Sequence, residues 1–167
     1  MMTILNRICA ALFAASLASS VMAAPDVAFD QSKIKLRAGA TFVLDVRMSD
    51  FPLSEGGGVT LRFDPSVVQV SEVTIDSGVW DFVNEPGSID NAGGSVADIL
   101  FSSYKGVAGD ARIATITFTA IHSGKSKVTI EESSFNPFSS DGNRVTVNFN
   151  KIDVHVLPVK KQQGNKL

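Results

Sequence analysis

The chain has very little of the side-chain chemistry that enzymes and metal centres use most. Its 167 residues contain one cysteine and two histidines. Zinc sites and activated nucleophiles need several such groups close together, and Cys9 lies in an N-terminal apolar run that we expect to be removed. Neither a Gly-x-Ser-x-Gly nor a His-Glu-x-x-His motif is present. The composition therefore predicts a protein that is not an enzyme and needs no cofactor or metal.

Large polar aromatic residues and net charge are also scarce. Trp80 and Tyr104 are the only residues of their types, and the formal net charge at pH 7 is −2. This mild acidity argues against nucleic acid as a partner, because nucleic-acid binding depends on Lys and Arg contacts with phosphates. His122 and His155 lie beside a turn and on an outward strand position, so we interpret both as polar surface groups.

The first 23 residues have the pattern of a secretory signal. Arg7 supplies a positive charge, residues 8–18 are apolar, and the segment ends in small residues that fit cleavage after Ala23. The apolar run is short for a membrane span. We expect a secreted or periplasmic protein with no membrane span after signal removal. The remaining chain divides into a domain over residues 24–158 and a disordered basic tail over residues 159–167.

Most of the chain after the signal alternates between apolar and polar residues, as β-strands do. The clearest example is residues 113–121, where Ala114, Ile116, Phe118 and Ala120 share one side. No helical period is found after the signal, and Gly, Asn and Asp clusters separate the runs. We expect loops over residues 49–58 and 104–110 and a short strand over residues 79–82. The pattern predicts an all-β sandwich.

A strand that ends in Asp64-Pro65 occupies the middle of this pattern. Val59, Leu61 and Phe63 alternate with polar residues before it, and a run of valines follows it. Proline has no N–H for a strand ladder, and Asp bonds nearby backbone groups. The segment therefore predicts a corner at which the chain passes from one sheet to the other.

Three segments, in this order along the chain, resemble the cohesin domain family. They are the entry Leu36-Arg37-Ala38-Gly39-Ala40-Thr41-Phe42, the corner Phe63-Asp64-Pro65-Ser66-Val67-Val68, and the strand from Gly109 to Ala120 with its following Gly124-Lys125-Ser126 turn. The resemblance covers Val27 to Leu157. It implies a nine-stranded jelly-roll β-sandwich, related to a class of carbohydrate-binding modules, with no catalytic role.

The resemblance also implies a partner. Cohesins bind dockerins, which are small helical modules with paired calcium loops, and so hold polysaccharide-degrading enzymes on a scaffold; the calcium belongs to the dockerin. In cellulosomal cohesins the strand before the Asp-Pro corner often carries an Asn/Asp pair that contacts the dockerin. The corresponding positions here are Gly56 and Gly58.

Two surfaces are candidate binding sites. The first is the polar side of the clearest strand, which we expect to face outward and to dock a protein partner; it comprises Ile113, Thr115, Thr117, Thr119 and Ile121. The alternative is a carbohydrate-binding or cell-surface matrix module that uses Trp80 and Tyr104. Against it stands a half-buried Trp80 that anchors a loop. Asp141-Gly142-Asn143 contains oxygen ligands suited to calcium, but its composition favours a turn.

Overall fold

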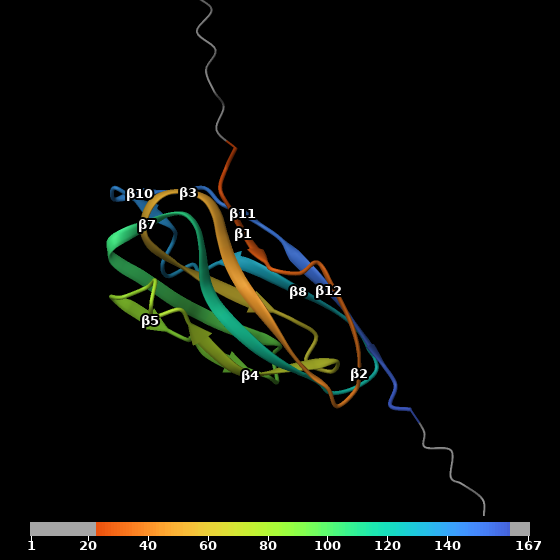
Figure 1. Ribbon diagram of the computed structural model, residues 1–167. Coiled ribbons are helices and arrows are strands. Elements are labelled where there is room, and N and C mark those ends of the chain that lie inside the picture. The colour runs from red at the N-terminus through yellow and green to blue at the C-terminus, as the bar shows by residue number, and fades with distance from the viewer. Residues whose placement is uncertain (1–22, 161–167) are drawn as a thin grey trace, which may run out of the picture.

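Figure 1 shows the computed structural model, which describes residues 23–160. These residues form twelve strands and no helix, and so none that is long and apolar enough to cross a membrane. The strands are β1 (Asp26–Phe29), β2 (Lys33–Arg37), β3 (Thr41–Arg62), β4 (Val68–Ile75), β5 (Val83–Glu85), β6 (Ser88–Asp90), β7 (Ser95–Ala120), β8 (Gly124–Glu132), β9 (Ser139–Ser140), β10 (Asn143–Arg144), β11 (Asn148–Phe149) and β12 (Lys151–Leu157). The predicted signal and most of the predicted tail lie outside the described residues.

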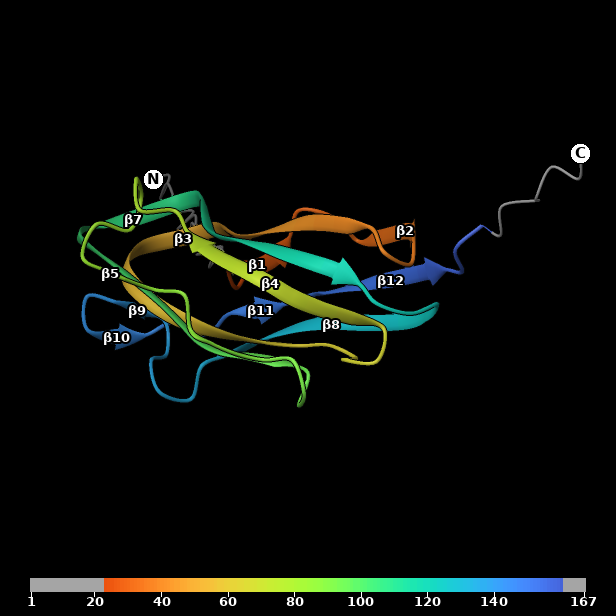
Figure 2. The same cartoon turned by 90° about the horizontal axis from the view of Figure 1, so that it is seen from below.

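The twelve strands form two packed layers because β3 and β7 each contribute to both. In the first layer, sheet I, residues 41–49 of β3 lie between β1 and residues 111–120 of β7, with β11 and β4 at the edges. In the second layer, sheet II, the order is β2, β12, β8, residues 56–62 of β3 and residues 95–102 of β7, with β5 and β6 beyond. Figure 2 shows β8, β12 and β2 side by side in sheet II.

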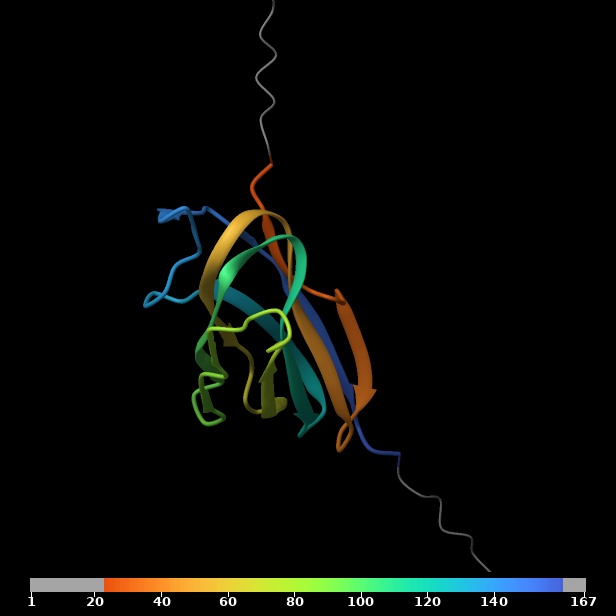
Figure 3. The same ribbon diagram turned by 60° about the vertical axis from the view of Figure 1, so that its left-hand side comes forward.

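β3 and β7 pass between the layers as a paired arch, which Figures 1 and 3 show at one end of the molecule. Their register shifts repeatedly between Val46 and Leu61, and Asp50, Gly106 and Gly109 have positive φ. Bulges of this kind add residues to one strand and bend it sharply. The predicted loops over residues 49–58 and 104–110 are therefore wrong, because each segment forms part of this paired arch.

The Asp-Pro corner connects β3 in sheet II to β4 in sheet I, as predicted. The Asp64 carboxylate accepts hydrogen bonds from the backbone N–H of Ser66 at 2.9 Å and from its hydroxyl at 2.6 Å. These bonds lower the pKa of Asp64. The backbone N–H groups of Val67 and Val68 donate to the Asp64 carbonyl, which places both valine side chains in the core. The corner thus joins the two layers and anchors the core at once.

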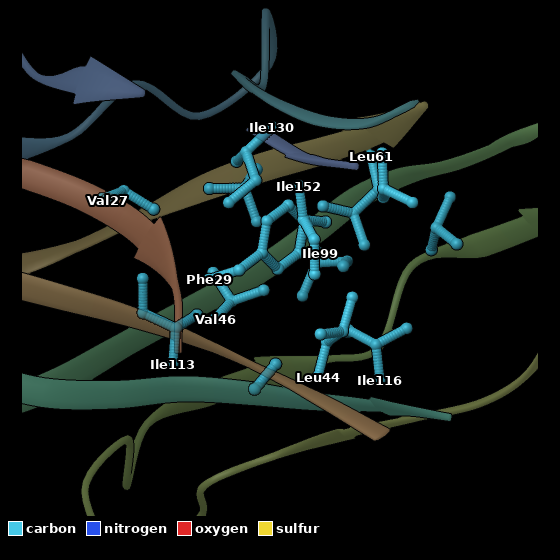
Figure 4. Close-up of a cluster of buried hydrophobic side chains, with 14 of the residues drawn as sticks. Val27, Phe29, Leu44, Val46, Leu61, Ile99, Ile113, Ile116, Ile130 and Ile152 are labelled. Atoms are coloured by element: carbon cyan, nitrogen blue, oxygen red, sulfur yellow. The ribbon is translucent and has the colours of Figure 1, made fainter. Parts of the chain in front are cut away.

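One apolar core fills the space between the sheets. Figure 4 shows Leu44, Val46, Ile113 and Ile116 of sheet I pointing toward Leu61, Ile99, Ile130 and Ile152 of sheet II. Phe118 packs edge-on against Phe63, with ring centroids 5.8 Å apart, and stacks on Phe42 at 5.1 Å. The predicted all-β sandwich is confirmed. The predicted count of nine strands is not, because the structure has twelve, several of them only two or three residues long.

Candidate docking surface

The outer face of sheet I carries the predicted threonine row. Thr115, Thr117 and Thr119 point outward and are half-buried, and Val43, opposite Thr117, is 46% exposed. The Thr115 hydroxyl donates to Asp45 at 2.7 Å. The row is therefore a flat, hydroxyl-rich surface whose polar groups are partly bonded to one another.

Arg112 closes one end of this threonine row. Its guanidinium lies 2.9 Å from the Asp76 carboxylate and 3.7 Å from that of Asp45. The hydrogen bond to Asp76 and the charges of both carboxylates raise the pKa of Arg112. This ion-pair group ties the end of β4 to β7. Arg47, which is opposite Arg112 in the register and exposed, takes part in none of the ion pairs found within residues 23–160.

Ile113 does not belong to the outer face, and its predicted role as a docking anchor is wrong. Its side chain is fully buried. Val46 pairs with Ala114 and Arg47 pairs with Arg112, so Ile113 is the extra residue of a β-bulge. The bulge turns both Ile113 and Ala114 toward the core. Ile121, at the other end of the row, is half-buried, and its backbone N–H donates to the Val67 carbonyl.

Trp80 does not present a ring to a ligand either, so the predicted pairing of Trp80 with Tyr104 is wrong. Trp80 is fully buried, its indole N–H donates to the Arg112 carbonyl at 2.9 Å, and its ring packs on Phe101 with centroids 4.6 Å apart. Residues 79–82 form an irregular segment that follows the turn at residues 77–79, instead of the predicted strand. The interpretation that a buried Trp anchors a loop is the one the structure supports.

Tyr104 is 73% exposed, but its neighbour is Phe82. The two ring centroids lie 4.2 Å apart with the planes tilted by 40°, and Phe82 itself is 57% exposed. We call these two residues the aromatic pair. Phe82 was not among the predicted site residues. A strand over residues 79–82 would place Phe82 on the same side as Trp80, whereas in the structure Trp80 is buried and Phe82 is exposed.

Backbone hydrogen bonds hold the aromatic pair in place. The N–H of Tyr104 donates to the Asp81 carboxylate at 3.0 Å, and the N–H of Phe82 donates to the Ser102 carbonyl at 3.1 Å. The bond from Tyr104, the Ser103 hydroxyl and the nearby Lys105 charge lower the pKa of Asp81, against a smaller opposing effect of desolvation. Two exposed rings are thus fixed at the edge of sheet II where β5 meets β7.

Three consecutive glycines of β3 pair with β7 beside the aromatic pair. We call Gly56, Gly57 and Gly58 the glycine floor. A Cβ on Gly56 would lie 2.2 Å from the Phe101 carbonyl oxygen, and one on Gly58 would lie 2.8 Å from side-chain atoms of Leu100 and Ser133. The Ser133 N–H donates to the Gly58 carbonyl, and its hydroxyl donates to Asp98 at 2.6 Å. Neighbouring chain thus occupies the space of any side chain at the two positions where cellulosomal cohesins often carry Asn or Asp.

The remaining sequence candidates lie in ordinary surface positions. Asp141 and Gly142 both have positive φ and form the turn between β9 and β10, as predicted. His122 and His155 are exposed. Within residues 23–160 no three His, Cys, Asp or Glu side chains are grouped so that they would hold a metal ion.

Comparison with known proteins gives one family and one fold. The model of the cohesin domain family matches residues 27–156, and no curated protein sequence matches the chain. A non-cellulosomal cohesin from the archaeon Archaeoglobus fulgidus is similar in structure, with a TM-score of 0.67 and 14% identity over 81% of this chain and 92% of that one.

Similar structures also come from cohesin–dockerin complexes. In the Coh-OlpA–Doc918 complex of Clostridium thermocellum, the similar chain gives a TM-score of 0.65 and 14% identity, covering 81% of this chain and 100% of that one. The corresponding chain of the Coh-OlpC–Doc435 complex from the same organism gives 0.64 and 18%, covering 80% and 95%. These TM-scores show the shared fold, and the family model matches residues 27–156, which are most of the chain. The chain therefore belongs to the cohesin domain family.

Proposed function

We propose that this protein is a non-catalytic docking module that binds a dockerin-type partner, a small helical module with calcium loops, through the aromatic pair and the adjoining outer face of sheet II. Membership of the cohesin family and the structural similarity to chains from cohesin–dockerin complexes support the class of partner. The observation that carries the choice of surface is the exposed, backbone-anchored aromatic pair.

Protein interfaces obtain most of their affinity from a few aromatic or Arg side chains, surrounded by contacts that exclude water. Most of the large exposed apolar residues lie away from sheet I, and include Leu53, Phe82, Tyr104 and Phe135. Among residues 23–160 the only one on the outer face of sheet I is Val43, opposite Thr117. The aromatic pair therefore has the anchor chemistry that the threonine row lacks.

The glycines beside the pair are not open to a partner, because Gly56 and Gly58 are buried and neighbouring chain fills the space in front of them. The segment that covers Gly58 extends into Phe135, which is 79% exposed. A partner that reaches the aromatic pair would thus contact side chains of β7 and of the segment after β8, in place of an Asn/Asp pair on β3.

A capture experiment tests the function. The protein is immobilised, the exported proteins of its host are passed over it with calcium, and a chelator elutes what has bound. We expect a chelator-released protein with paired calcium loops, identified by mass spectrometry. An empty eluate, or only proteins without such loops, would contradict the dockerin-type role.

Matched variants test the surface. Tyr104→Ala removes an anchor, and we expect capture to weaken by about tenfold or more. Thr117→Arg places a bulky charge on the threonine row and should leave capture within about twofold. If Thr117→Arg weakened capture and Tyr104→Ala did not, the docking site would be the row comprising Thr115, Thr117 and Thr119.

The aromatic pair also favours a second function, carbohydrate binding, because exposed rings with a polar edge suit both kinds of ligand. Here the relevant residues are Tyr104 and Phe82, and Trp80 has no part. Retention on insoluble polysaccharide that Tyr104→Ala abolishes, together with an empty eluate in the capture experiment, would favour this function over docking.

We also propose that the protein acts outside the cytoplasm, where a link to polysaccharide degradation would be useful. The signal pattern of residues 1–23 supports export. The mass of the protein recovered from its native host tests this point. A mature chain that begins at Ala24 is expected, and an intact N-terminus would contradict cleavage.

A further inference from the structure

The outer face of sheet II carries a concentration of positive charge at the edge opposite the aromatic pair. In the strand register, Asp153 of β12 lies between Lys33 of β2 and Lys127 of β8, and His155 lies between Lys35 and Lys125. All of these residues are exposed. Arg37 and Lys151 extend the array at its ends. We call the six cations the basic strip: Lys33, Lys35, Arg37, Lys125, Lys127 and Lys151.

The basic strip surrounds a shallow groove and has little charge compensation. The groove has a volume of about 650 Å³, and its lining includes Lys33, Lys125, Lys127 and His155. The ion pairs found within residues 23–160 all use other cations, namely Arg62, Arg112 and Arg144. Six cations thus remain grouped around one carboxylate in a protein whose formal net charge is −2.

Protection of a sheet edge explains only part of this arrangement. β2 is an edge strand, and lysines on edge strands prevent unwanted pairing with other chains. Lys125 and Lys127 lie on β8, however, which is paired on both sides by β12 and β3. Edge protection gives no reason for cations on this interior strand.

We propose that the basic strip binds a linear acidic polysaccharide, a sugar polymer with repeated carboxylate groups. From Lys151 to His155 the strip extends about 13 Å along β12, and it spans about 10 Å across three strands. Five of the six cations are lysines. Lysine presents a compact, strongly hydrated charge without the bidentate geometry of arginine. Such a surface suits a hydrated polymer whose charges repeat along its length.

Other anionic partners fit the basic strip less well. A folded protein partner would need a cluster of apolar anchors, but of the large exposed apolar residues within 23–160 only Val159, which follows Pro158 at the Arg37 end, lies near the strip. Single-stranded nucleic acid would need aromatic side chains on which its bases stack, and the strip has none. An anionic membrane surface would need apolar side chains that insert into it.

The basic strip and the aromatic pair can be occupied together. The strand order of sheet II places β2 and β12 at one edge and β5 at the other, with β8, β3 and β7 between them. A protein that holds an acidic polymer at one edge and a protein partner at the other would fix that partner on the polymer. The polymer-binding role needs no dockerin-type partner, so the two proposals can fail separately.

Retention on immobilised polygalacturonate tests this inference, with fully methyl-esterified polygalacturonate as the neutral control on the same backbone. We expect binding to the acidic polymer only, weakening about tenfold or more between about 20 and about 300 mM salt because exposed charges are screened. No binding at low salt, or equal binding to the esterified polymer, would overturn the inference.

Two variants with the same net charge distinguish binding by the basic strip from an effect of the protein's overall charge. Lys33→Gln/Lys127→Gln removes the cations that flank Asp153 and should weaken retention by about tenfold or more. Arg47→Glu, on the outer side of β3 in sheet I, changes the net charge by the same amount and should alter retention by less than about twofold. Equal losses in both variants would contradict a localised site.

A third polymer tests the chemical class. Soluble poly-glutamate carries carboxylates on a peptide backbone, and we expect it to compete with polygalacturonate at least about tenfold less effectively than free polygalacturonate does. Equal competition would overturn the assignment to a polysaccharide and indicate an acidic peptide. Thermal unfolding of every variant checks that the fold is intact, which is expected because each substituted side chain is exposed.

Discussion

The outer faces of the two sheets differ in how their polar groups are used. On sheet I the threonine row is partly satisfied by its own neighbours, as in the bond from Thr115 to Asp45, and Arg112 is paired with two carboxylates. On sheet II the chain leaves exposed rings at one edge and unpaired lysines at the other. Under the proposed function, sheet I is mainly a solvated structural face and sheet II is the binding face.

β7 contributes residues to the outer faces of both sheets, and it contains a bulge in each sheet. Asp98 has positive φ where the register with β3 shifts, and Ile113 is the extra residue of a second bulge. Each bulge changes which side chains point outward without changing the sequence alternation on either side. The outward residues of β7 therefore depend on these backbone irregularities as well as on the alternation of its sequence.

Replacing Ile113 gives the largest expected effect and tests the boundary between core and threonine row. Ile113→Asp places a carboxylate in a fully buried position, and we expect it to lower the free energy of unfolding by at least about 4 kcal/mol. Thr117→Arg, on the same strand but outward, should change it by less than about 1 kcal/mol. Urea denaturation measures both. A stable Ile113→Asp protein would mean that Ile113 faces solvent.

Trp80 and Tyr104 provide the second test, because sequence analysis paired them and the structure separates them. Trp80→Ala removes a buried ring that packs on Phe101 and should cost about 3–5 kcal/mol of stability. Tyr104→Ala removes an exposed ring and should cost less than about 1 kcal/mol. Urea denaturation measures both losses of stability. Comparable losses would contradict the conclusion that Trp80 stabilises the fold while Tyr104 is free to bind a partner.

Much of the fold follows from sequence features that act locally. The Asp64-Pro65 corner, the turn at Asp90–Gly94 and the alternation of Thr115, Thr117 and Thr119 depend on neighbouring residues alone, and the structure contains each of them. Short-range hydrogen bonds and side-chain period determine these elements. The order of three segments, namely the entry at Leu36–Phe42, the corner at Phe63–Val68 and the strand from Gly109 to Ala120, was also enough to indicate the cohesin family.

The proposed binding surface could be predicted less well from the sequence, because it depends on pairings between distant residues. The bulge at Ile113 arises from the register between β3 and β7, and the arch pairs glycine-rich segments that looked like two separate loops. The lysines of the basic strip are also far apart in the sequence. Lys33 and Lys127 flank Asp153 only because β2 and β8 both pair with β12. No local pattern contains that information.

The glycine floor gives a third, smaller effect that tests the packing beside the aromatic pair. Gly56→Ala would place a Cβ 2.2 Å from the Phe101 carbonyl oxygen, which only a backbone shift can relieve, and we expect a loss of about 3 kcal/mol. Gly142→Ala serves as the control: its φ is +71°, but no atom lies within 4 Å of the added Cβ, so about 1 kcal/mol is expected. Equal losses in thermal unfolding would mean that backbone conformation, and not the contact with β7, requires glycine at position 56.

The smallest expected effect concerns the charge under the aromatic pair. The Tyr104 N–H and the Ser103 hydroxyl lower the pKa of Asp81 in the folded protein, so the ionised carboxylate stabilises the fold at pH values above the unfolded pKa. This contribution is lost as the pH falls through the folded pKa. Asp81→Asn keeps an oxygen that accepts from Tyr104 but removes the charge. Its melting temperature should therefore lie slightly below that of the wild type at neutral pH, and the two should converge in acid. A difference that persists in acid would mean that the charge of Asp81 does not hold Tyr104 in place, and that the exposed ring is fixed by its packing on Phe82 instead.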